Sequence, residues 1–207
     1  MSTDDSFSET EDRLIEAVQC LLAEGGASAC SMRAIADRAG VTPGAIYKHF
    51  KDKDALVDHV VMRAFEQFEL YLLKAILSLP VGSLERLAAL GEAYITFAEA
   101  NPSEFAILFN PLLAERRKLA DLPGEGGFSV LRQCVVEAID AGVLRAADPD
   151  LVALFLWSRV HGIVMLTLAC DLGDMMGHRE SPAVALFNLT RSFMVEGLAH
   201  RQPRESD

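Results

Sequence analysis

The chain has only four cysteines among its 207 residues, and they are widely separated. Cys20, Cys30, Cys134 and Cys170 form no Cys-x-x-Cys pair and have no histidine partner at the spacing of a zinc site. We therefore expect free thiols in a reducing cytoplasm, without disulfides, a bound metal or another cofactor. Cys30, directly before a predicted helix cap, is the one candidate for a redox-sensitive thiol.

The sequence also lacks the motifs that carry common enzyme chemistry. It contains no Gly-x-Ser-x-Gly, no phosphate-binding loop, no His-Glu-x-x-His and no paired cysteine ligands. The glycines between positions 121 and 127 have the wrong spacing for a phosphate-binding fingerprint, and no predicted strand precedes them. We therefore expect that the protein is not an enzyme.

No segment shows the sustained two-residue alternation of a strand, whereas apolar residues recur every three or four positions throughout. This periodicity predicts an all-α protein with about nine helices. With 51% hydrophobic residues, the chain can bury a substantial core in one or two domains. Apart from two short helices near residue 40, the predicted helices cover residues 11–24, 53–79, 83–100, 103–109, 111–119, 128–141, 150–170 and 182–200.

Acidic residues outnumber basic ones by 30 to 19, so the net charge is −11. The start of the chain is polar and acidic, which predicts a disordered tail over 1–10 and no signal peptide. Between positions 25 and 53 the balance reverses, because this segment has five basic residues and two acidic ones. A basic segment on an acidic protein is typical of a site-specific binder that is steered to nucleic acid.

Residues 31–53 contain the signals of two short helices around a tight turn. Ser31 and Thr42 are predicted N-caps, because their hydroxyl groups can accept hydrogen bonds from free backbone N–H groups. Gly40 stands where a helix end often requires a left-handed residue, and Pro43 suits the first position of the next helix. One helix therefore ends and another begins within four residues, which is helix-turn-helix geometry.

This segment resembles the DNA-binding domain of the tetracycline-repressor (TetR) family of bacterial transcription regulators. The residues that carry the resemblance are Ser31, Ile35, Ala36, Ala39, Gly40, Val41, Thr42, Gly44, Tyr47, His49, Phe50, Lys53 and Leu56. The resemblance implies a three-helix DNA-binding head over 11–56 and a ligand-binding and dimerisation domain over 57–207. In the second domain, Trp157-x-x-x-His161-Gly162 is similar to a signature of one TetR subgroup.

The head offers several candidate DNA contacts. Polar side chains at the ends of the short helices can donate to phosphate oxygens, which positions a protein on the duplex. The second helix contains no Arg, Asn or Gln for bidentate base reading, so DNA shape is expected to contribute to recognition. The predicted DNA-binding residues are Ser31, Arg33, Thr42, Pro43, Gly44, Ala45, Tyr47, Lys48, His49 and Lys53.

The most apolar stretch, residues 151–170, is long enough to cross a membrane. Arg159 and His161 lie at its centre, however, and an arginine at the middle of a membrane span costs about 2.5–3.5 kcal/mol. We therefore favour a helix buried inside a dimer over a membrane span. The TetR family commonly dimerises through its last two helices, which here implies contacts through 150–170 and 182–200.

The resemblance also implies a small-molecule pocket in the second domain. Trp157 and His161 stand out, because polar groups on an apolar helix usually have partners, and those partners can be either a ligand or the protein itself. For each aromatic residue an ordinary core position is the alternative. The predicted ligand-binding residues are Phe65, Phe68, Tyr94, Phe97, Phe105, Phe109, Trp157, His161 and Met165.

These features together predict a cytoplasmic, ligand-responsive regulator of transcription. The family default is a homodimeric repressor that binds double-stranded DNA at a palindromic operator and is released by a small hydrophobic molecule. The alternative is a helical protein-interaction module with a silent DNA-binding head.

Overall fold

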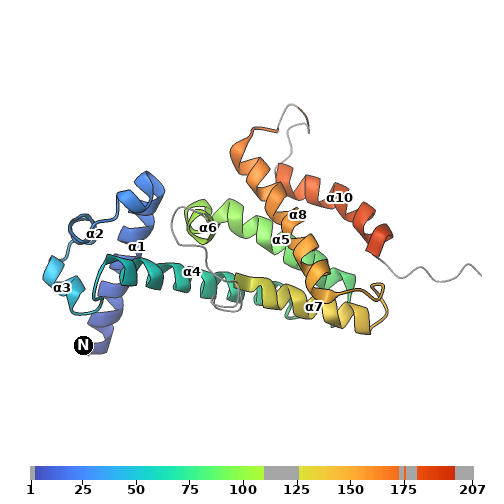
Figure 1. Ribbon diagram of the computed structural model, residues 1–207, viewed down its shortest axis with the longest axis horizontal. Coiled ribbons are helices and arrows are strands. Elements are labelled where there is room, and N and C mark those ends of the chain that lie inside the picture. The colour runs from blue at the N-terminus through green and yellow to red at the C-terminus, as the bar shows by residue number, and fades with distance from the viewer. Residues whose placement is uncertain (1–2, 110–125, 173–174, 176–180, 199–207) are drawn as a thin grey trace, which may run out of the picture. The chain divides into compact units, whose positions relative to one another are not determined.

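The computed structural model describes residues 3–109, 126–172, 175 and 181–198. In these residues it contains nine α-helices, one short 3-10 helix and no β-strand (Figure 1). The all-α fold class predicted from the apolar periodicity is therefore confirmed. The elements are α1 (Thr3–Gly25), η1 (Gly26–Ser28), α2 (Met32–Ala39), α3 (Pro43–Tyr47), α4 (Lys53–Ile76), α5 (Leu84–Ala100), α6 (Pro102–Phe109), α7 (Phe128–Asp140), α8 (Pro149–Ala169) and α10 (Pro182–Leu198).

The chain divides into two compact units. The first, here called the head unit, comprises Met1–Gln67 and Asn101–Pro123, and the second, the body unit, comprises Phe68–Ala100 and Gly124–Asp207. The change from one unit to the other falls inside α4, so this single helix contributes to both. The division predicted at residue 56 follows the sequence motif, whereas the packing also assigns more of α4, and all of α6, to the head unit.

The head unit is built around α1, which packs against α2 and α6. Residues of α1 from Leu14 to Leu22 that recur at helical spacing are buried. The neighbouring helices α2, α3 and α4 contribute the fully buried Ile35, Ile46 and Leu56. Because a buried aliphatic side chain contributes about 1.5–3 kcal/mol, this core can hold α3, which is too short to be stable alone.

The first helix extends further toward the start of the chain than predicted. The helix α1 begins at Thr3, so residues 3–10 form part of it, where the sequence predicted a disordered acidic tail. Acidic residues near a helix N-terminus are favoured by the helix dipole. The segment is polar and acidic without an apolar run, which is why disorder was expected there.

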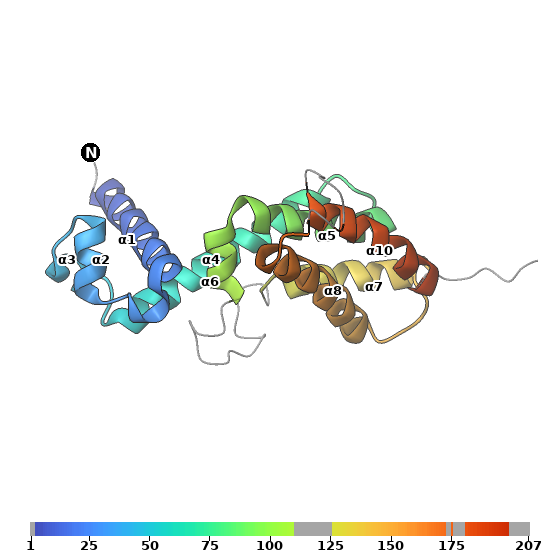
Figure 2. The same ribbon diagram turned by 90° about the horizontal axis from the view of Figure 1, so that it is seen from above.

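In the body unit, α5 packs against α7, α8 and α10, and α8 lies beside both α7 and α10 (Figure 2). The buried side chains between these helices include Tyr94, Val135, Ala153 and Val164. The helix α10 begins at the predicted residue and continues to the end of the described segment. The helix predicted over 111–119 lies outside the described residues.

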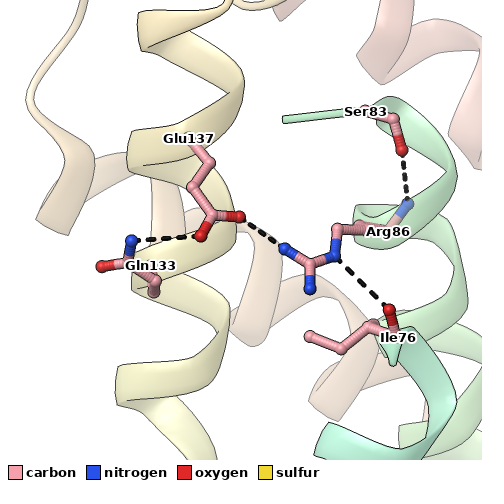
Figure 3. A network of polar contacts seen from close by, with 5 residues as sticks. All are labelled: Ile76, Ser83, Arg86, Gln133 and Glu137. Atoms are coloured by element: carbon pink, nitrogen blue, oxygen red, sulfur yellow. Dashed lines mark hydrogen bonds and ion pairs between the residues drawn. The ribbon is translucent and has the colours of Figure 1, made fainter. Parts of the chain in front are cut away.

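A polar network joins three helices of the body unit, namely α4, α5 and α7 (Figure 3). Arg86 donates from Nε to the backbone oxygen of Ile76 (3.5 Å) and pairs through Nη1 with Glu137 (2.7 Å). Gln133 donates to the same carboxylate (3.1 Å). The hydroxyl of Ser83 accepts from the Arg86 backbone N–H (3.3 Å) and so caps the start of α5. The end of α4 is thereby tied to α5 and α7, and α4 ends slightly earlier than its periodicity predicts.

Candidate DNA-binding face and effector cavity

The turn between α2 and α3 has the predicted geometry. The hydroxyl of Ser31 accepts a hydrogen bond from the Ala34 N–H (3.1 Å), and that of Thr42 accepts one from the Ala45 N–H (3.3 Å). Gly40 is left-handed (φ 66°, ψ 36°), and its N–H points to carbonyl oxygens in the last turn of α2. Both N-caps and the left-handed helix end are therefore confirmed, and they set the direction in which α3 leaves α2.

A residue of α1 that the sequence did not single out completes this turn. The guanidinium of Arg13 donates to the backbone oxygens of Ala39 and Gly40, the latter at 3.1 Å. Carbonyls at a helix end lack helical partners, so a cation is favourable there. A Cβ on Gly40 would lie 2.7 Å from Arg13 Nη2. Position 40 therefore requires glycine for its backbone conformation, and a Cβ there would also push the Arg13 guanidinium away from these carbonyls.

The predicted DNA-binding residues lie in α2 and α3, at the N-caps of both helices, in the turn that follows α3 and at the start of α4. Within α3 the side chain of Ile46 is fully buried, whereas that of the next residue, Tyr47, is 56% exposed. Ala45 and Lys53 are half-buried. The other predicted contacts are exposed, namely Ser31, Arg33, Thr42, Pro43, Gly44, Lys48 and His49. Their polar groups are thus placed where a phosphate backbone could reach them.

The basic residues between positions 31 and 53 differ in how firmly they are paired with carboxylates. Arg33, Lys51 and Lys53 each lie 3.9 Å from a carboxylate only one or four positions along the chain. Such exposed pairs contribute between zero and about 1 kcal/mol, so these cations can exchange partners with a phosphate. Arg38 instead makes two hydrogen bonds to Glu24 of α1, at 3.0 and 2.6 Å. Arg38 therefore serves the packing of α2 on α1.

The body unit contains a cavity of about 330 Å³ bordered by residues of α4, α5, α7, α8 and α10. Small-molecule sites in proteins commonly measure about 300–1,000 Å³. Most of the wall is aliphatic or aromatic, and it includes Phe68, Tyr94 and Trp157 from the predicted ligand-binding set. The cavity is therefore large enough for a compact small molecule and apolar enough to favour a hydrophobic one.

Three of the predicted residues are joined by hydrogen bonds at this wall. The Trp157 indole N–H donates to the Tyr94 hydroxyl (3.4 Å), and that hydroxyl lies 2.8 Å from His161 Nδ1. Burial raises the pKa of Tyr94 and lowers the pKa of His161. Because an indole can only donate, the neutral tyrosine can accept from Trp157 and donate to a neutral His161. Tyr94 and Trp157 line the cavity, and His161 orients the tyrosine.

The remaining predicted ligand-binding residues lie elsewhere. Phe97 is buried behind the wall, with its ring centroid 4.9 Å from that of a wall phenylalanine. Met165 of α8 is 47% exposed. Phe65, Phe105 and Phe109 belong to the head unit, where the ring of Phe109 packs against the other two. None of these five is in the wall of this cavity, and their part in ligand binding stays a prediction.

Sequence reasoning selected only three residues of the wall. Of those it missed, the ones that set the shape and charge of the cavity include Gly91, Arg159, Phe187 and Arg191. A Cβ on Gly91 would lie 2.2 Å from the ring of Phe187, so glycine allows α10 to approach α5 closely. Arg159 drew attention only as an obstacle to membrane insertion. A lone arginine in the most apolar helix was the available signal, because a charge in such a helix usually has a partner.

The helix α8 leaves much of its apolar surface exposed in a single chain. It is long and apolar enough to span a membrane by length and composition alone, and only 28% of its most apolar window is buried. A single helix of this kind is weak evidence for a membrane span. Among the side chains that the structure describes, the large exposed apolar residues of α8 and α10 are Leu151, Leu154, Phe155, Met165, Leu166, Leu168 and Leu189. Exposed apolar patches on a soluble protein often mark interaction sites.

The four cysteines are free. Burial raises the pKa of the Cys30 thiol, although the nearby charge of Lys53 opposes the shift, and burial raises that of Cys134 to about 11. The thiolate is the reactive form, so both residues are poorly suited to redox chemistry. In the described part of the chain, no three His, Cys, Asp or Glu residues are grouped so that they could hold a metal ion.

Two family models match the chain. Residues 14–60 match the bacterial regulatory proteins of the tetR family, and residues 87–189 match the tetracyclin repressor-like C-terminal domain. The two ranges together include the helix-turn-helix and most of the cavity wall. The chain belongs to the TetR family. This family consists of transcriptional regulators and not of enzymes.

Several relatives of this TetR-family chain have names or solved structures. The HTH-type transcriptional repressor KstR2 of Mycolicibacterium smegmatis is 31% identical over 112 residues, which are 54% of this chain and 52% of KstR2. The chain thus spans no more than about half the length of the curated relatives that it matches.

Two solved structures have the same fold. The ketosteroid transcriptional regulator KstR2 of Mycobacterium tuberculosis has a TM-score of 0.64 at 21% identity, with 92% of this chain and 95% of that chain covered. FadR of Bacillus subtilis in complex with stearoyl-CoA has a TM-score of 0.72 at 21% identity, with 89% and 97% covered. At these identities the likeness establishes the fold alone.

Proposed function

We propose that this TetR-family protein is a ligand-responsive, homodimeric repressor that binds a palindromic operator in the bacterial cytoplasm. The observation that carries the proposal is the helix-turn-helix, in which both helices are capped and Tyr47, Lys48 and His49 are exposed at the end of α3. These three side chains can hydrogen-bond to phosphates while the start of α3 enters the major groove. Relatives named as repressors support repression over activation.

A homodimer accounts for the exposed apolar face of α8 and α10. Leu154 and Phe155 of α8, with Leu189 of α10, are well exposed in the single chain, and a second copy would cover them. A two-fold dimer presents the same surface to itself, and its two heads match the two halves of a palindrome. Linking the heads also raises the effective concentration of the second head once the first is bound.

The proposed effector is a small hydrophobic molecule that binds in the cavity of the body unit. One relative is described as a ketosteroid regulator and another was solved with stearoyl-CoA, and both descriptions favour an apolar effector. The helix α4 contributes Phe68 and Leu72 to the cavity wall and its first part to the head unit. An effector that prefers another position of α4 would lower DNA affinity, typically by about 1–3 kcal/mol or 5–150-fold.

The test of this function is DNA binding by the purified protein at a series of salt concentrations, with a random-sequence duplex. Each phosphate contact should contribute about −0.9 to the slope of log affinity against log salt. Lys48→Gln should reduce the steepness of that slope by about one contact. The control is Lys74→Gln, which changes an exposed lysine of α4 in the body unit and should leave the slope unchanged.

The alternative function, a protein-interaction module with a silent head, makes the opposite prediction. Its DNA binding would be absent even at low salt, or its affinity would not depend on the salt concentration. Either result would contradict the proposed regulator.

A further inference from the structure

The effector cavity has a cationic side chain whose hydrogen-bonding capacity is only partly used. Arg159 of α8 donates from Nη1 to the backbone oxygen of Phe187 (3.4 Å) and to the hydroxyl of Thr190 (2.5 Å). Its Nε is buried and has no hydrogen-bond partner among the described residues. In the same part of the chain no carboxylate lies within ion-pair distance of this guanidinium. A buried donor without an acceptor is unfavourable, especially on a charged group.

A second arginine adds to this positive charge. Arg191 of α10 also borders the cavity and reaches its nearest carboxylate, Glu92, at 3.8 Å, with both side chains nearly half-exposed. Burial, followed by the charge of Arg191, lowers the pKa of Arg159, so the two cations are close enough to repel each other. The exposed ion pair between Arg191 and Glu92 offsets little of the positive charge of the two arginines.

As far as the structure describes the chain, the wall contains no carboxylate that pairs with Arg159 or Arg191. The carboxylate of the wall is Glu85, which is exposed at the start of α5. Its pKa is lowered by hydrogen bonds from its own backbone N–H and from Ser83, so it is held at the helix N-terminus. No ion pair joins it to Arg159 or Arg191 among the described residues. An external anion is therefore the group that could satisfy these arginines.

We propose that the cavity binds an amphipathic organic anion, with its apolar body among Phe68, Tyr94 and Trp157 and its acidic group on Arg159 and Arg191. This inference rests on the proposed function, since it names the chemical class of the effector. An acidic group would gain charge-assisted hydrogen bonds from two guanidiniums in a poorly hydrated site. The volume of about 330 Å³ suits the apolar part of a compact acid.

The position of Arg159 could also serve only to hold α8 and α10 together. An experiment can separate this structural role from anion binding. The guanidinium carbon of Arg159 lies 4.4 Å from the ring centroid of Phe187, so this arginine also joins α8 to α10. An arginine with only that role would not distinguish an acid from a neutral molecule of the same shape. The affinity ratio of matched acids and alcohols therefore tests the proposal directly.

The experiment uses two pairs of probes: dodecanoate with dodecanol, and 2-naphthylacetate with 2-(2-naphthyl)ethanol. Trp157 is the one tryptophan in the sequence and borders the cavity, so its fluorescence reports binding of the linear pair. Calorimetry serves for the naphthyl pair. At neutral pH at least one acid should bind the full-length protein about tenfold or more tighter than its alcohol. Equal affinities within both pairs, or no binding by either acid, would overturn the proposal.

Three variants test whether the preference for the acid over its alcohol depends on the two arginines. Arg159→Gln and Arg191→Gln should each bring the affinity of the acid toward that of the alcohol while the alcohol binds as before. Because Arg159→Gln could loosen α10, Arg191→Gln is the independent test, since its side chain is nearly half-exposed. Arg145→Gln is the matched control, because Arg145 is exposed and outside the cavity wall. A selectivity that survives both pocket substitutions would refute the role given to the arginines.

The experiments give different results if the anion site is wrong and if the proposed regulatory function is wrong. If the acids bind selectively but leave DNA affinity unchanged, the anion site stands and the cavity is not the regulatory site. If acid and alcohol bind equally and both weaken DNA binding, the regulatory function stands and the anion site is wrong.

Discussion

The ring of Phe187 occupies the space in which a side chain at Gly91 would lie. A Cβ at position 91 would be 2.2 Å from Phe187 Cζ. The ring is buried, and the guanidinium of Arg159 lies over it, so it cannot move aside without disturbing α8 as well. Because these three residues border the cavity, the contact links the packing of α5 and α10 to the shape of the proposed effector site.

Gly91→Ala should therefore destabilise the protein by about 1–3 kcal/mol, as overpacking commonly does. Without the contact, alanine would favour the helix by about 1 kcal/mol, so the sign of the change is informative. Unfolding in urea measures the change in the free energy of unfolding. The double variant Gly91→Ala/Phe187→Leu should cost less than the sum of the two single changes, since the smaller side chain relieves the clash. Additive costs would show that the two positions do not meet.

Gly40→Ala should destabilise the head unit by about 1–2 kcal/mol, because a left-handed alanine is strained and its Cβ would displace the Arg13 guanidinium from the backbone oxygens at the end of α2. Thermal unfolding and DNA affinity should both decrease. Gly44→Ala is the matched control for stability, since a Cβ there would meet no atom closer than 4.0 Å. If both glycines tolerate alanine equally, the turn geometry assigned to position 40 is incorrect.

Phe155→Glu should disrupt the proposed dimer, because it places a charge in an apolar interface at a cost of several kcal/mol. Sedimentation equilibrium of the wild type should give a dimer, and the variant should give a monomer with weakened operator binding. Leu77→Glu changes a leucine that is 83% exposed and lies outside α8 and α10, so it should leave the dimer intact. A wild-type monomer at micromolar concentration would contradict this interface.

Tyr47→Ala should weaken binding to all duplexes alike, by about 1 kcal/mol, because a phosphate contact carries no sequence information. Ala45→Arg should instead change which sequence is preferred, since an arginine at the start of α3 can read guanine. Competition between duplexes measures both effects. An unchanged affinity for Tyr47→Ala would remove that residue from the DNA contacts.

The features that the sequence predicted well are set by residues close together in the chain. The caps at Ser31 and Thr42 and the left-handed Gly40 depend on groups within one or two helical turns. Apolar periodicity likewise predicted the helices and their buried faces. The contacts that were missed join distant segments: Arg13 with the end of α2, 26 positions away, and Gly91 with Phe187. No local pattern specifies which helix will approach such a residue.

The candidate cavity was only partly predictable for the same reason. Periodicity indicates that an aromatic residue is buried, but not which cavity or core it faces. Phe68 and Phe65 lie three positions apart on α4, yet they belong to different compact units. The arginines of the wall were missed because the sequence does not show which carboxylates the fold brings near them. Among the described residues Arg159 has no carboxylate at ion-pair distance, and Arg191 has a loose pair with Glu92 at 3.8 Å.

The measurement that tests the account most directly is selection of random duplex DNA by the purified full-length protein, followed by sequencing of the retained fraction. A two-fold dimer with intact heads should enrich a palindrome whose half-sites are about one helical turn, or a multiple of it, apart. Adding the acid that binds most tightly should reduce the amount of this DNA retained. No enriched sequence at either low or moderate salt would contradict the account of the protein as a DNA-binding repressor.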